Sequence, residues 1–301
     1  MSAQILDGKK VSAEVKEELK PRINYLTERG YQPGVAVVLV GDDPASQIYV
    51  RNKERACEKL GIYSIQHRLP ASTSQEEVIK LVNSLNQDER IHGILVQLPL
   101  PSHIQEKEVL YHISPEKDVD GFHPYNLGRL MIGDPIFLPC TPWGVQELLL
   151  RYNLSPEGKN VVIVGRSNIV GKPLAMMLVQ KGKGANATVS MCHTGTRNLS
   201  SYTQMAEILI AACGSPRLIT KDMIKEGAIV VDVGINRVGD KTVGDVDFEG
   251  VKEVASYLSP VPGGVGPMTI AMLMANTVKA AERVMERKTY EGGLTGKRKV
   301  F

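Results

Sequence analysis

Short runs of valine, isoleucine and leucine recur along the chain, separated by longer segments in which apolar residues return every three or four positions. The clearest runs are VAVVLV from Val35, VVIVG from Val161 and AIVVDVG from Ala228. Continuous apolar runs of this length are typical of strands in a buried parallel sheet, and the periodic segments between them are typical of amphipathic helices. The pattern therefore predicts an α/β fold whose parallel sheets are covered by helices on both faces.

The same pattern places the individual elements. In the first half it predicts helices at 10–29, 44–60 and 75–87, and strands at 35–40, 62–69 and 91–97. In the second half it predicts helices at 142–153 and 172–181, a long helix from about Pro267, and strands at 161–164, 187–192, 206–211 and 228–233. Residues 99–142 are rich in proline and glycine, which is typical of long functional loops. The apolar face expected of the last helix carries Met268, Ala271, Met272, Ala275 and Val278, which we interpret as core.

Composition excludes several classes of protein. With 301 residues, 43% of them hydrophobic and 23% charged, the chain is long enough for two globular domains or one large α/β domain. The net charge of +3 is too small for a dedicated nucleic-acid binder. The four cysteines show no CxxC spacing, so we expect neither a disulfide framework nor a metal site. No segment reads as a signal peptide or reaches the roughly 18–20 apolar residues of a membrane helix, so we expect a cytoplasmic protein.

The predicted helix 44–60 contains a lysine in an otherwise apolar stripe. Asp43 is a plausible N-cap, with Pro44 at the first helical position and Gly61 at the end. Lys53 shares a helix face with Tyr49, Ala56 and Leu60. A partly buried lysine can serve acid/base chemistry, with the aromatic ring stacking on a flat substrate. Equally, the lysine can extend along the stripe and keep its charge in water.

Two further polar residues lie where ligands are usually bound. Gln97 ends the strand GILVQ, and ligands of open α/β sheets bind at the carboxyl ends of strands. Asp120, in KDVDGF, could accept paired hydrogen bonds from an amidine-like edge such as that of a pterin. The alternatives are a strand cap at Gln97 and an Asx-turn at Asp120.

The segment VVIVGRSNIVGKP, at residues 161–173, has the pattern of a nucleotide-binding turn. A buried strand leads through Gly165 and Gly171 into a helix, whose amino end attracts a pyrophosphate. Ser167 takes the place of the second glycine of GxGxxG. The next strand ends in His193 and Thr194 instead of an acidic residue, and Arg166 is available for a 2′-phosphate, so NADP is preferred over NAD.

The segment SPVPGGVGPMT, at residues 259–269, combines three prolines and three glycines before the last helix. Glycines at 263 and 264 allow the backbone to approach a ligand closely, and the helix start after Gly266 is favourable for anions. An ordinary turn is the alternative interpretation.

Together these segments closely resemble the bifunctional methylenetetrahydrofolate dehydrogenase/methenyltetrahydrofolate cyclohydrolase family, over nearly the whole chain. The motifs that carry the resemblance are SQIYVRNKERACEKLGI, GILVQLPLP, PEKDVDGFHPYNLGRL, PCTP, GRSNIVGKP, VVDVGINRV, GDVDF and PVPGGVGPMT, in the family's order.

The resemblance implies two α/β domains flanking a cleft. A folate-binding catalytic domain would comprise residues 1–142 and 270–301, and a Rossmann-like NADP-binding domain residues 143–269. The implied reactions are NADP-dependent oxidation of 5,10-methylenetetrahydrofolate and hydrolysis of the methenyl product to 10-formyltetrahydrofolate, in the one-carbon metabolism that serves purine biosynthesis. A homodimer is also implied, with no nucleic acid, membrane or metal.

The resemblance also implies roles for individual residues. Lys53 would be the catalytic lysine, Tyr49 its stacking partner, Gln97 its hydrogen-bonding neighbour and Asp120 the anchor of the pterin edge. The implied folate-binding residues are Tyr49, Val50, Arg51, Asn52, Lys53, Val96, Gln97, Leu98, Asp120, Pro262, Gly263, Gly264, Val265 and Gly266. The implied NADP-binding residues are Gly165, Arg166, Ser167, Thr194 and Ile235.

Two rival hypotheses remain at this point. One is an NAD-dependent, monofunctional methylenetetrahydrofolate dehydrogenase on the same fold. The other is a non-catalytic dinucleotide-binding module, against which the presence of Lys53, Gln97 and Asp120 counts.

Overall fold

The computed structural model describes residues 2–296, which divide into two compact units. The three-stranded unit comprises residues 15–126 and 273–296, and the six-stranded unit comprises residues 2–14 and 127–272. The unit boundaries fall within two long helices, α1 (Gly8–Glu28) and α10 (Val265–Gly296), and within α5 (Pro124–Met131). The family resemblance assigns folate to one domain and NADP to the other. That assignment of ligands, and the domain boundaries that go with it, stay a prediction.

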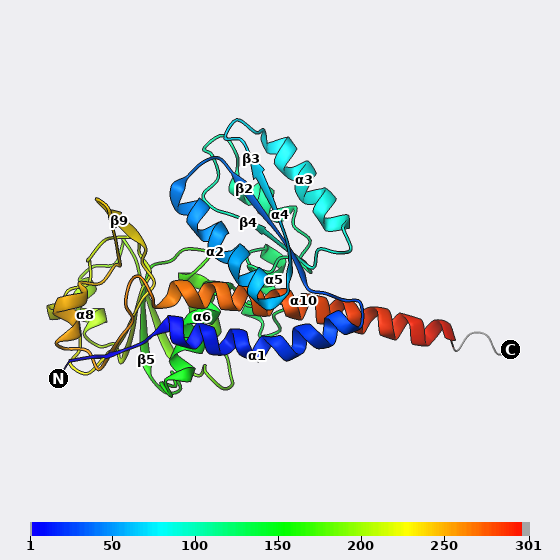
Figure 1. Ribbon diagram of the computed structural model, residues 1–301. Coiled ribbons are helices and arrows are strands. Elements are labelled where there is room, and N and C mark those ends of the chain that lie inside the picture. Colours follow the sequence, from blue (N-terminus) through cyan, green and yellow to red (C-terminus); the bar gives the residue numbers. More distant parts are fainter. Residues whose placement is uncertain (1, 297–301) are drawn as a thin grey trace. The chain divides into compact units, whose positions relative to one another are not determined.

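The three-stranded unit is built on a parallel sheet with the strand order β3–β2–β4. Its strands are β2 (Gly34–Val40), β3 (Tyr63–Leu69) and β4 (Gly93–Val96), and its helices besides parts of α1, α5 and α10 are α2 (Pro44–Leu60), α3 (Gln75–Gln87) and α4 (Glu106–Tyr111). Figure 1 shows α3 on one side of this sheet and α2 on the other. Val78, Val82 and Leu85 of α3 pack against Ala36 and Val38 of β2, which makes one face of the central strand a buried core.

Local signals fix the two central helices of this unit. The Asp43 carboxylate accepts a hydrogen bond from Ser46 N at 2.7 Å, Pro44 is the first helical residue, and Gly61 ends α2 at φ 72°. These three predicted boundary residues are confirmed. Helix α3 begins with a capping box between Ser74 and Glu77.

The six-stranded unit is built on a second parallel sheet, with the order β1–β11–β8–β7–β5–β6. Its strands are β1 (Gln4–Ile5), β11 (Tyr257–Leu258), β8 (Ile229–Asp232), β7 (Ile208–Ala211), β5 (Asn160–Val164) and β6 (Thr188–Cys192). Its further elements are α6 (Cys140–Arg151), α7 (Gly171–Leu178), α8 (Leu199–Thr203), η1 (Lys221–Met223), the antiparallel hairpin β9 (Asn236–Val238) and β10 (Lys241–Val243), and α9 (Phe248–Lys252).

The core of this sheet follows the two-residue period of its strands. Val162 and Val164 of β5, Leu209 of β7 and Val230 of β8 belong to one buried cluster. Both sheets are parallel and alternate with helices, so the predicted α/β fold is confirmed.

Some predicted boundaries were wrong, for identifiable reasons. Helix α7 ends at Leu178 instead of residue 181, and Gly182 and Gly184 follow it at positive φ. Helix α10 begins at Val265, two residues before the predicted start at Pro267. The two-residue strand β1 was missed because it is too short to show a period.

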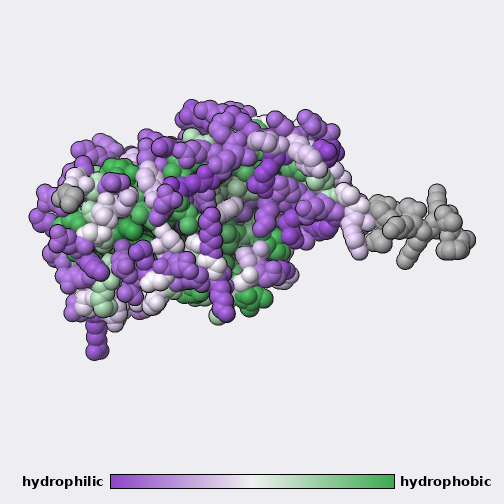
Figure 2. Space-filling model, turned by 90° about the horizontal axis from the view of Figure 1, so that it is seen from below, coloured by the Kyte–Doolittle hydropathy of each residue, from purple (hydrophilic) through white to green (hydrophobic). Residues whose placement is uncertain are grey.

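The surface and the last helix agree with the sequence pattern. The face shown in Figure 2 is mainly hydrophilic, with smaller hydrophobic areas among the polar residues. The predicted apolar stripe of α10 is confirmed as core, since Met268, Ala271, Met272, Ala275 and Val278 are all at most 5% exposed. Within residues 2–296, no helix is both long and apolar enough to cross a membrane.

Candidate active site

Lys53 and Gln97, which are 44 residues apart in the sequence, are in direct contact in the three-stranded unit. Lys53 Nζ, on α2, donates a hydrogen bond to Gln97 Oε1 at 3.0 Å. The Gln97 side chain is held in turn, because its Nε2 donates to Leu98 O at 2.8 Å, and its backbone N donates to Val38 O at 2.8 Å. The lysine thus has a defined position at the carboxyl end of β4, where α/β sheets bind ligands.

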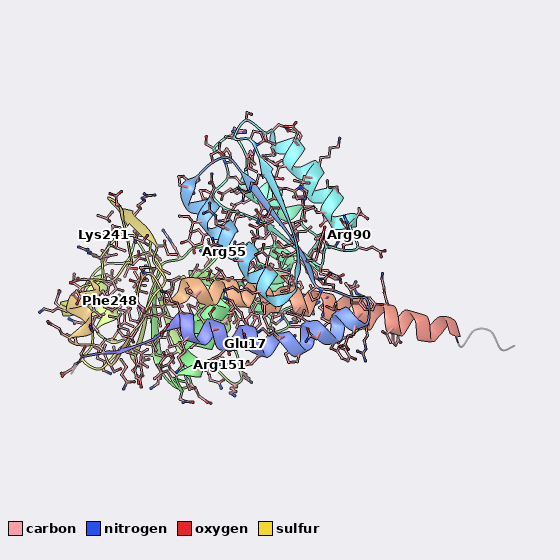
Figure 3. All side chains as sticks on the ribbon, in the orientation of Figure 1. Glu17, Arg55, Arg90, Arg151, Lys241 and Phe248 are labelled. Carbon is pink, nitrogen blue, oxygen red and sulfur yellow. The ribbon has the colours of Figure 1, made fainter. Side chains whose placement is uncertain are left out.

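The remaining residues of α2 separate into two faces, as its amphipathic pattern indicates. Tyr49 lies one turn before Lys53 and is half-buried, and burial raises the pKa of its hydroxyl. Arg51 and Asn52 are exposed, as is Arg55, which Figure 3 labels on this helix. An aromatic side chain and a half-buried amine therefore share one helix face, a combination suited to holding a flat substrate beside a proton donor.

Val50 and Val96 serve the core of the unit. They are 1% and 3% exposed, so what they can offer a ligand lies mainly in the backbone. Leu98 is half-buried and precedes Pro99 through a cis peptide bond.

Asp120 lies in a loop that is fixed by a buried neighbour, Asp118. Asp118 is 2% exposed, and its carboxylate accepts hydrogen bonds from Phe122 N at 3.2 Å, His123 N at 2.8 Å and Asn126 Nδ2 at 2.8 Å. Burial raises the pKa of Asp118, and these hydrogen bonds oppose that rise. The loop around the half-buried Asp120 is therefore rigidly held at both ends.

The predicted nucleotide turn joins β5 to α7 in the six-stranded unit. Gly165 has φ 131°, and a Cβ there would lie 2.0 Å from Ala212 O, so no other residue fits. The Ser167 hydroxyl accepts hydrogen bonds from Val170 N at 3.1 Å and Gly171 N at 3.4 Å, which orders the turn before the helix. Arg166 and Ser167 are exposed on this turn.

Two more predicted cofactor residues follow other strands of the same sheet, one after β6 and one after β8. Strand β6 pairs with β5 in the register Cys192 opposite Val164, so Thr194 leaves the sheet beside the Gly165 turn. Thr194 is exposed, and Ile235, just after β8, is 51% exposed. All three turns lie at carboxyl ends of parallel strands.

The proline- and glycine-rich segment 259–266 forms a tight turn that contacts the start of α1 within the six-stranded unit. Gly264 N donates to Pro260 O at 2.8 Å, and Lys9 N donates to Gly263 O at 3.2 Å. Because α10 begins at Val265, Val265 and Gly266 belong to its first turn, and only Pro262, Gly263 and Gly264 lie in the loop.

The comparisons with known proteins agree with this geometry. Residues 6–120 match the family model "Tetrahydrofolate dehydrogenase/cyclohydrolase, catalytic domain", and residues 139–285 match the NAD(P)-binding domain of the same family. The chain belongs to the tetrahydrofolate dehydrogenase/cyclohydrolase family. The predicted family is confirmed.

Relatives within the family cover nearly the whole chain. The chain is 62% identical over 284 residues to the "Bifunctional protein FolD" of Moorella thermoacetica, covering 94% of this chain and 100% of that protein. Among solved structures, the bifunctional FolD dehydrogenase/cyclohydrolase of Campylobacter jejuni has a TM-score of 0.89 at 53% identity, covering 94% of this chain and 99% of that one. The FolD of Trypanosoma brucei, complexed with NADP cofactor and inhibitor, has a TM-score of 0.90 at 37% identity, covering 95% of this chain and 99% of that one.

Family membership confirms the predicted enzyme class, a bifunctional dehydrogenase and cyclohydrolase with a nicotinamide cofactor. The roles of individual residues stay predictions. Sequence reasoning assigned no role to Asp118 and Asp245, although the quoted motifs KDVDGF and GDVDF contain them. Asp245 directly follows Gly244, and Asp118 lies three residues before Gly121. An aspartate near a glycine between predicted elements is the signal that could have found them, but it is also the signal of any turn.

Proposed function

We propose that the protein oxidises 5,10-methylenetetrahydrofolate with NADP and then hydrolyses the 5,10-methenyl product to 10-formyltetrahydrofolate. The observation that carries this proposal is the hydrogen bond from Lys53 Nζ to Gln97 Oε1, in a chain of this family. This hydrogen bond supports a lysine whose amine is held at one position, and a proton-transfer step on a bound substrate requires such a fixed amine.

In the first reaction a hydride leaves the methylene carbon between N5 and N10, and the substrate becomes the methenyl cation. The bound nicotinamide supplies the chemistry by accepting that hydride. The chain's own task is orientation. We assign stacking against the pterin to Tyr49, and paired hydrogen bonds with the pterin N–H and NH₂ edge to the Asp120 carboxylate. The fixed loop around Asp118 supports this role of Asp120.

In the second reaction water adds to the methenyl carbon, the bond from that carbon to N5 breaks, and one proton is released. We assign Lys53 the movement of protons between the attacking water and N5, with Gln97 holding the amine in place. Proton transfer is required in this step but not in the hydride transfer, so Lys53 matters most for hydrolysis.

We assign NADP binding to the six-stranded unit, through Gly165, Arg166, Ser167, Thr194 and Ile235. The charge of this region fits a 2′-phosphate. Residues 165–172 and 188–196 contain no acidic side chain, while Arg166 and Lys172 lie on the Gly165 turn and in the first turn of α7. We assign the loop Pro262–Gly264 and the following Val265 and Gly266 to contacts with folate and nicotinamide.

A cofactor-dependent absorbance assay tests the proposal. The purified protein should reduce NADP in the presence of methylenetetrahydrofolate, with a higher kcat/KM for NADP than for NAD, and it should hydrolyse methenyltetrahydrofolate without nucleotide. A preference for NAD would refute the Arg166 assignment. Missing hydrolysis would favour a monofunctional dehydrogenase, and missing turnover in both assays a binding module.

We also propose that the protein is a cytoplasmic homodimer. Its four free cysteines suit a reducing compartment. In the six-stranded unit β6 is an edge strand, and a pocket of about 300 Å³ near it is lined mostly by apolar side chains, among them Leu130, Met176 and Met191. Open strand edges and apolar patches are the usual sites of pairing between two copies. Light scattering should give about twice the chain mass of 32.9 kDa.

A further inference from the structure

A buried carboxylate with no part in the proposed chemistry lies beside the proposed cofactor site. Asp245 is 0% exposed and lies between β10 and α9 in the six-stranded unit. Figure 3 labels Lys241 on β10 and Phe248 on α9, which lie on either side of Asp245 in the sequence.

The Asp245 carboxylate accepts four hydrogen bonds. Its Oδ2 accepts from Cys213 N at 2.7 Å and Gly214 N at 2.9 Å, and its Oδ1 accepts from Ser215 N at 2.9 Å and Asn236 Nδ2 at 2.8 Å. Successive backbone N–H groups of this kind form a concave anion-binding nest. Here the chain fills the nest with its own carboxylate.

These bonds join two loops that are far apart in the sequence. Residues 213–215 follow β7, and Asn236 lies at the end of the loop that follows β8. Because β7 and β8 are neighbouring parallel strands, both loops start at the edge of the sheet where dinucleotides bind. Ile235, assigned above to the cofactor, directly precedes Asn236.

The sequence leaves room for this arrangement. A Cβ on Gly234 would lie 2.3 Å from Asp245 Cγ, so the carboxylate occupies the space that any other side chain would need. The backbone of Asp245 is fixed as well, since its N–H donates to Asp232 Oδ1 at 3.0 Å. Asp245 is therefore held from several sides.

We propose that Asp245 is a positioning residue for the dinucleotide: it sets the relative placement of the loops after β7 and β8 and thereby the shape of the cofactor site. This rests on the proposed function, and Asp245 itself does not touch substrate or cofactor. Charge-assisted hydrogen bonds to backbone N–H groups are stronger than neutral ones, which suits a single carboxylate to this task.

The variant Asp245→Asn tests the proposal with little change in shape. Each carboxylate oxygen accepts two hydrogen bonds, so either orientation of the amide places an NH₂ group against two donors and loses two of the four bonds. Asp247→Asn is the matched control, because Asp247 lies two residues further on and its side chain makes no capping hydrogen bond to α9.

Three quantities are measured on the full chain: the Kd for NADP by calorimetry, the KM values of the dehydrogenase reaction, and the kcat/KM of methenyltetrahydrofolate hydrolysis without nucleotide. For Asp245→Asn we expect Kd and KM for NADP to rise at least tenfold, with hydrolysis within twofold of the wild type. Asp247→Asn should leave all three within twofold.

The inference is overturned if NADP binding by Asp245→Asn stays within twofold of the wild type. It is also overturned if both activities fall together with unchanged KM values, because a merely structural role lowers the amount of folded protein. If Asp245→Asn does not fold, Asn236→Ala tests the inference by the same measurements, because it removes one of the four donors. For this variant we expect Kd and KM for NADP to rise two- to fivefold. A wild type without NADP-dependent turnover would instead refute the proposed function, and that result is visible before any variant is made.

Discussion

A single methyl group at Gly8 should disturb the loop that carries Pro262. Gly8 is the first residue of α1, and a Cβ there would lie 1.7 Å from Gly264 O and 3.1 Å from Gly263 O. Moving the Gly264 carbonyl from 1.7 Å to even 3.0 Å requires a shift of about 1.3 Å. The variant Gly8→Ala introduces this methyl group.

A shift of the loop that contains Pro262, Gly263 and Gly264 costs free energy. Its proline rings restrict φ, Gly264 N is bonded to Pro260 O, and Lys9 N is bonded to Gly263 O. Overpacking a well-packed site typically destabilises the folded state by about 1–3 kcal/mol, and the higher helix propensity of alanine over glycine stabilises it by up to about 1 kcal/mol. Because the 1.7 Å approach is to a backbone atom, the upper end of the first range applies, and we expect a net loss of about 2 kcal/mol in the free energy of unfolding.

The effect on activity should be larger than the effect on stability. A displacement of about 1 Å in a group that positions the substrate can reduce rates about a hundredfold. If Pro262–Gly266 contact folate and nicotinamide as proposed, kcat/KM of both reactions should fall by about that factor in Gly8→Ala. Steady-state kinetics and urea unfolding measure the two effects on the same preparation.

Gly128→Ala is the matched control. Gly128 lies in α5, and a Cβ there meets nothing within 4 Å, so this variant should keep full activity and unchanged or slightly higher stability. Wild-type stability in Gly8→Ala would show that α1 does not restrain the loop. Lost stability with normal kinetics would show that the loop does not contact the ligands.

Three further predictions concern the three-stranded unit. Lys53→Met should abolish methenyltetrahydrofolate hydrolysis and leave part of the dehydrogenase activity. The control Lys59→Met, on the exposed face of α2, should change neither activity. Equal retention of both activities by Lys53→Met would falsify the proton-transfer role. Asp120→Ala should raise the Kd for folate at least tenfold in a binding titration and leave the Kd for NADP within twofold, and an unchanged folate affinity would remove Asp120 from the site. Burial lowers the pKa of His92 to about 4 from 6.5, and its Nδ1 accepts from Gly34 N, so the folded state needs a neutral ring. Because the unfolded chain binds the proton first as pH falls below 6.5, the protein should lose about 3 kcal/mol by pH 4, and urea unfolding of His92→Gln should show a correspondingly weaker dependence over this range.

The sequence was most informative where one helix or strand carries the whole signal. The apolar runs located the main strands, and Asp43, Pro44 and Gly61 located α2 to the residue. The pairing of Lys53 with Gln97 is different, because only the family resemblance implies it and nothing within either segment predicts that the two side chains meet. Only the order of β2 and β4 in the sheet brings α2 and the end of β4 together.

Asp245 and Gly8, to which sequence reasoning assigned no role, share one physical property: each approaches backbone groups in distant segments. Asp245 is bonded to N–H groups 30 to 32 positions away, and the close approach of Gly8 is to a carbonyl 256 positions later. A lysine inside an apolar stripe is unexpected at that position, so it is recognised from the sequence. An aspartate or glycine in a loop is expected there, so it is not. The role of such a loop aspartate or glycine is therefore recognised only when the fold shows which backbone groups it contacts. A loss of ligand binding on substitution at such a position would be a consequence of displaced backbone and would need no contact with the ligand.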